Sequence, residues 1–94
     1  MANMDKQAII TVLGRDRVGI IAAVSTELAN GGVNILDINQ TILQDMFTMA
    51  MLVDYSGMQP DLSEMQSKLN ALGEQLGVEI RMQRKAIFDA MHRI

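Results

Sequence analysis

One stretch near the N-terminus, from Thr11 to Ile21, constrains the fold of this 94-residue chain more than any other. A nearly continuous apolar run over residues 8–13 ends at Gly14, three charged residues follow, and a new apolar pattern begins at Val18. This order predicts a central strand buried on both faces, then a tight turn, then a helix. Because the first N–H groups of a helix lack intrahelical partners, the turn is the first place to look for a small anion or a carboxylate.

Two helices are predicted from their apolar spacing and their ends. In the first, the apolar positions are followed by a stop at residues 30–32, where glycine accepts the left-handed conformation. In the second, Asp61 is the expected cap, with Glu64 three residues later. The apolar positions of these two helices are, respectively, Ile20, Ile21, Val24 and Leu28, and Leu62, Met65, Leu69, Leu72 and Leu76.

Three further segments are predicted to be strands. Residues 33–43 and 46–54 are joined at Gln44-Asp45, which predicts a hairpin, and residues 78–83 alternate as a half-exposed strand does. In residues 33–43, strict alternation predicts that Leu36, Ile38 and Ile42 share one face, and that Ile35, Asp37, Asn39, Thr41 and Leu43 share the other.

The order of elements is strand-helix-strand, given twice. It predicts an α+β, ferredoxin-like βαββαβ fold, with a four-stranded antiparallel sheet and two helices on one face. We expect one domain over residues 1–94, with a core over about residues 7–84 and a short C-terminal helix over about residues 86–94. Because strands two and three carry apolar residues on both faces, we expect the uncovered face to pack against another chain or beneath the C-terminal helix.

The composition excludes several classes of function. A net charge of −3 and three aromatic residues argue against direct nucleic-acid binding. With no cysteine and with His92 as the single histidine, we expect no metal site, no cofactor and no nucleophile–base pair. No apolar segment approaches the roughly 20 residues that span a bilayer, and the N-terminus lacks a signal-peptide core. We therefore expect a soluble, cytoplasmic protein that makes no membrane contact.

The charged turn offers groups for a ligand, and each has a structural alternative. Asp16 can receive an ammonium group, or it can cap the first helix. Arg15 and Arg17 can hold a carboxylate, or they can simply face water. Gly19 can let a ligand approach the backbone, or it can be required by the packing of the helix on the sheet.

Polar residues at the start of the second strand offer further groups. The amide of Asn34 can bind both ends of an amino acid, or it can fix its own turn. Asp37 lies between Leu36 and Ile38, where a carboxylate needs a partner or water. We expect these residues to lie at the same end of the sheet as the charged turn.

Together these motifs resemble the ACT domain, and in particular the small stand-alone ACT proteins of bacteria that are similar to glycine-cleavage regulators. The resemblance rests on Gly14, on the run from Asp16 to Ile21, on Asn34-Ile35-x-Asp37 and on residues 87–94, and it covers nearly the whole chain. Many ACT domains have proline where this chain has Val18.

The resemblance implies a regulatory module, not an enzyme, that forms a homodimer or a higher oligomer. It implies that a small amino acid or related metabolite binds between the first-strand turn of one subunit and the second-strand start of a neighbour. The alternative is a protein-interaction or transcription-regulatory adaptor with a vestigial ligand site. The ligand-binding residues that the resemblance implies are Gly14, Arg15, Asp16, Arg17, Val18, Gly19, Ile20, Asn34, Ile35, Leu36 and Asp37.

Overall fold

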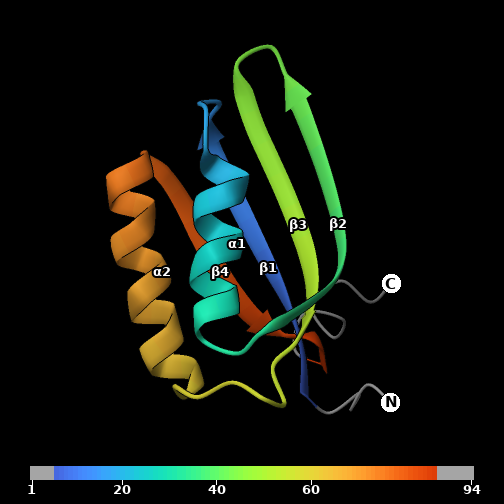
Figure 1. Cartoon of the computed structure of the whole chain (residues 1–94). Coiled ribbons are helices and arrows are strands. Elements are labelled where there is room, and N and C mark those ends of the chain that lie inside the picture. The colour runs from blue at the N-terminus through green and yellow to red at the C-terminus, as the bar shows by residue number, and fades with distance from the viewer. Residues whose placement is uncertain (1–5, 87–94) are drawn as a thin grey trace.

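The computed structural model describes residues 6–86, which form one open sheet with two helices packed on one face (Figure 1). The strand order is β2-β3-β1-β4, and every neighbouring pair is antiparallel. The predicted α+β ferredoxin-like fold is therefore confirmed. The elements are β1 (Gln7–Arg15), α1 (Ile20–Asn30), β2 (Asn34–Leu43), β3 (Met46–Asp54), α2 (Leu62–Leu76) and β4 (Val78–Arg84).

The predicted C-terminal helix falls on residues 87–94, which lie outside the described residues. Within residues 6–86, no helix combines the length and the apolar character needed to cross a membrane.

The helix ends follow the local signals in the sequence. Asp61 caps α2 as predicted, because its Oδ1 accepts a hydrogen bond of 2.7 Å from the N–H of Glu64. Helix α1 ends at Asn30 as predicted, but the left-handed residue is Gly32 (φ 82°), since Gly31 keeps a helical conformation (φ −86°). The chain therefore turns one residue later than the first glycine of the pair.

The core lies between the helices and one face of the sheet. Its largest fully buried side chains include Ile10, Val12, Met49 and Met51 from the two central strands. From the helices they include Val24, Leu28, Met65 and Leu69. Methionine thus fills space that aromatic side chains occupy in many other cores.

The prediction that β1 is buried on both faces is wrong. Ile10 and Val12, which face the helices, are fully buried, but Thr11 is half-buried and Leu13 is exposed on the opposite face. The helices cover only one face of the sheet. Although β1 lies between two other strands, its side chains on the other face therefore remain accessible to solvent. At the turn end, that opposite face exposes Leu13, Leu43 and Met46.

The predicted faces of β2 are wrong at its start, because the strand contains a β-bulge. Ile35 lies opposite Val53 and Asp37 lies opposite Leu52, so Leu36 has no partner across the strand pair. The extra residue resets the alternation, because side chains change face at every residue of a regular strand. Ile35 therefore lies on the helix-facing side together with Ile38 and Ile42, and not with Asp37 as predicted.

Candidate functional site

The turn after β1 enters α1 through a left-handed glycine. Arg15, Asp16, Arg17 and Val18 are all exposed, and Gly19 has φ 93°. A Cβ atom at Gly19 would meet nothing within 4 Å, so the glycine is required by its backbone conformation and not by packing against the sheet. The space in front of the helix end is therefore open to a ligand.

Helix α1 begins without a side-chain cap. No side chain bonds to its first N–H groups, and its first turn contains no acidic residue, so the alternative in which Asp16 caps the helix is wrong. The first helical bond runs from the N–H of Ala23 to the carbonyl of Gly19 (2.9 Å), which leaves the N–H groups of residues 20–22 without intrahelical partners. Those groups and the helix dipole favour a negative charge at this point.

A shallow pocket of about 290 Å³ adjoins this helix end. Residues 16, 17 and 19–22 line one side of the pocket, while Gln40, Ile42 and Phe47 line the other. Sequence reasoning missed these last three residues, because they become neighbours of the turn only when the β2–β3 hairpin folds beside β1. The pocket therefore combines the unpaired N–H groups of the helix start and the side chains of Asp16, Arg17 and Gln40 with apolar walls.

The two arginines of the turn make contacts within the protein. The Nη1 group of Arg17 donates to the carbonyl of Leu76 (3.2 Å) and to that of Gln75 (3.5 Å), at the C-terminal end of α2. The last turn of α2 contains no basic residue of its own, so Arg17 supplies the cation that a helix C-terminus favours. Arg15 forms an exposed ion pair with Asp45 at 3.8 Å, a kind that contributes little to stability.

The predicted residues at the start of β2 do not lie beside the turn. Asn34 and Gln7 both pair with Asp54, whereas Leu43 and Arg15 both pair with Met46, so β1 and β2 run parallel. The end of one strand and the start of the other then lie at opposite ends of the sheet, about 30 Å apart for a strand of this length. The expectation that Asn34 and Asp37 lie at the same end of the sheet as the charged turn is therefore wrong within one chain.

Asp37 has a local explanation for its carboxylate. Its side chain is exposed on the sheet face away from the helices, and its Oδ1 accepts a hydrogen bond of 2.9 Å from the N–H of Ile38. Water and its own backbone therefore satisfy the charge without any ligand.

Comparison with known proteins identifies the family of the chain. A family model described as "ACT domain" matches residues 6–83. A UPF0237 protein of Bifidobacterium longum is 52% identical over 88 residues, which cover 94% of this chain and 98% of the relative.

Two solved structures carry the same fold. An ACT domain protein from Streptococcus pneumoniae aligns with a TM-score of 0.77 and 43% identity. The alignment covers 88% of this chain and 93% of the pneumococcal chain. A candidate glycine cleavage system transcriptional repressor aligns with a TM-score of 0.72 and 29% identity, covering 84% of this chain and 45% of its own. ACT domains are typically regulatory, ligand-binding modules. On the match to the family model and on the sequence identity to its relatives, this chain belongs to the ACT domain family.

Proposed function

We propose that this protein is a regulatory module whose pocket binds a small amino acid, or a related metabolite, between two subunits. The observation that carries the proposal is the uncapped start of α1, which opens into a pocket with the Asp16 carboxylate at its side. An α-amino acid carries a carboxylate and an ammonium group close together. The free N–H groups of α1 suit the carboxylate and Asp16 suits the ammonium group, while Ile42 and Phe47 suit a small side chain.

In this proposal, the second subunit pairs with the edge strand β2. This strand is at the edge of the sheet, contains one charged residue in ten and no proline, and exposes Ile38 and Ile42. Natural proteins usually protect a free edge strand with charges or proline, so an unprotected edge favours pairing with another strand. A second copy of this chain, paired antiparallel about a twofold axis, is the partner that we propose.

Such a pair would bring the two halves of the predicted site together. If Gln40 lies opposite its own copy, Ile38 pairs with Ile42 of the partner subunit, and both lie on the helix-facing side. The start of the partner's β2, residues 34–37, then runs past the hairpin residue Asp45. The carbonyl of Asp45 accepts a hydrogen bond of 2.8 Å from the N–H of Asp16, so this position adjoins the turn.

Calorimetric titration with each of the twenty amino acids tests the proposal. We expect at least one of them to bind the wild type, and Asp16→Asn to weaken that binding by about tenfold or more, because a charge-assisted hydrogen bond is lost. Asp45→Asn is the matched control, since it removes the same charge next to the pocket without changing its lining. An equal loss in both variants would contradict the role of Asp16, and no heat and no thermal shift for any amino acid would contradict amino-acid binding.

An adaptor with a vestigial ligand site is the second candidate function. It is favoured by Val18, which is 99% exposed at the tip of the turn and stands where many ACT domains have proline. Recovery of a stable partner from the native host that is lost with Val18→Ser, combined with the absence of amino-acid binding, would support the adaptor.

A further inference from the structure

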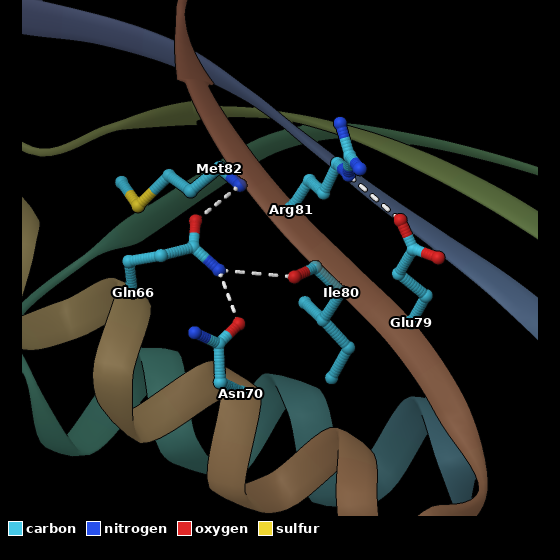
Figure 2. A network of polar contacts seen from close by, with 6 residues as sticks. All are labelled: Gln66, Asn70, Glu79, Ile80, Arg81 and Met82. Atoms are coloured by element: carbon cyan, nitrogen blue, oxygen red, sulfur yellow. Dashed lines mark hydrogen bonds and ion pairs between the residues drawn. The ribbon is translucent and has the colours of Figure 1, made fainter.

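The outer edge of β4 is covered by one side chain from α2. Figure 2 shows the carboxamide of Gln66 lying against this edge. Its Oε1 accepts a hydrogen bond of 2.9 Å from the N–H of Met82, and its Nε2 donates one of 3.0 Å to the carbonyl of Ile80. The same Nε2 donates to Oδ1 of Asn70 at 2.8 Å, which holds the carboxamide in place.

This contact has the pattern of a strand pairing. The carbonyl of Ile80 and the N–H of Met82 are two residues apart, so they point to the same side of β4, away from β1. A residue of an added parallel strand would bond to this same pair of groups. Gln66 therefore occupies a position that a peptide group of another chain would otherwise take.

The two edges of the sheet are protected to different degrees. Strand β4 carries three charged residues in seven, and two of them, Glu79 and Arg81, form an ion pair of 2.7 Å (Figure 2). In strand β2, Asp37 is the single charged residue among ten. Charged side chains on an edge discourage strand addition, so the protection is concentrated on β4.

We propose that Gln66 closes the β4 edge and thereby makes assembly stop at two subunits. The proposal rests on the proposed function only for the pairing through β2. A twofold pair consumes both β2 edges and leaves two β4 edges at its ends. If those were open, further copies would add to them and the sheet would grow into a fibre. With Gln66 in place, the carbonyl of Ile80 and the N–H of Met82 are already bonded, so a second copy of this chain cannot pair with them.

The test is Gln66→Met in the full chain, which keeps an unbranched side chain of similar length and removes the hydrogen bonds. In dilute solution, before further copies add, we expect the amide of Met82 to exchange with solvent about fivefold faster than in the wild type, the factor of one typical hydrogen bond. By light scattering, we expect the particle mass to rise to at least twice that of the wild type. Asn70→Ala is the matched control, because it removes the third bond of the carboxamide but leaves both bonds to β4, and it should keep the wild-type mass.

A folded Gln66→Met variant with the wild-type mass would overturn the proposal, whatever the exchange of Met82. If Gln66→Met does not fold, Gln66→Ala removes the same bonds and is judged by the same two measurements. A wild type that is monomeric at all concentrations would contradict the β2 pairing of the proposed function. A rise in mass on Gln66→Met would support closure of the β4 edge even then, so the two failures are distinguishable.

Discussion

Replacing Gly32 with alanine is expected to lower the free energy of unfolding by about 3 kcal/mol. Gly32 has φ 82°, a conformation that costs other residues about 1–2 kcal/mol. The added Cβ would also lie 2.5 Å from the carbonyl oxygen of Gly57, so one of the two backbone segments must move, which typically costs about 1–3 kcal/mol. For a domain of this size the melting temperature should fall by about 15 °C, which calorimetry or urea unfolding measures.

Gly77→Ala separates the two causes. Gly77 also has a positive φ, 74°, but a Cβ at that position would meet nothing within 4 Å. Its replacement should therefore cost only the conformational part, about 1–2 kcal/mol. Equal destabilisation by the two variants would show that the close approach of Gly32 to Gly57 is unimportant.

Ile20→Ala is expected to destabilise the protein by about 2–5 kcal/mol and to disturb the pocket. Ile20 is the first residue of α1 and is 2% exposed, so its removal leaves a cavity beneath the helix start. Because Ile20 anchors the N–H groups that we propose as the carboxylate site, amino-acid binding should weaken as well. Chemical unfolding and calorimetric titration on the same preparation measure the two effects.

The neighbouring Ile21 is a matched control. It also lines the pocket but is 36% exposed, so Ile21→Ala should cost less than about 1 kcal/mol. If the two alanine variants lose equal stability, Ile20 does not anchor the helix start as the structure indicates.

The parts of the fold that were predictable from the sequence depend on local signals. The cap at Asp61, the apolar repeat of α2 and the hairpin at Gln44-Asp45 each lie within one element or one turn. Such signals are set by backbone geometry and side-chain spacing, so they can be interpreted without knowing the rest of the chain. The turn from Gly14 to Gly19 was identified in the same way.

The features that were missed depend on which segments meet in space. The bulge at Leu36 changes the faces of β2 without any glycine to mark it. The contact of Arg17 with the carbonyls of α2 joins residues 59 positions apart. The opposite placement of Asn34 and the turn follows from the parallel direction of β1 and β2, which is set by β3 lying antiparallel between them.

The distribution of methionine in this core has a consequence for oxidation. Met49, Met51 and Met65 are fully buried, whereas Met46 is 47% exposed at the hairpin end of the sheet. Conversion of a thioether to a sulfoxide requires access of the oxidant to sulfur, and the polar product disrupts an apolar core. Mild peroxide should therefore modify Met46 while the fold protects the three core sulfur atoms. Sulfoxide at Met49, Met51 or Met65 would then show that the core had been exposed to solvent by local or global unfolding.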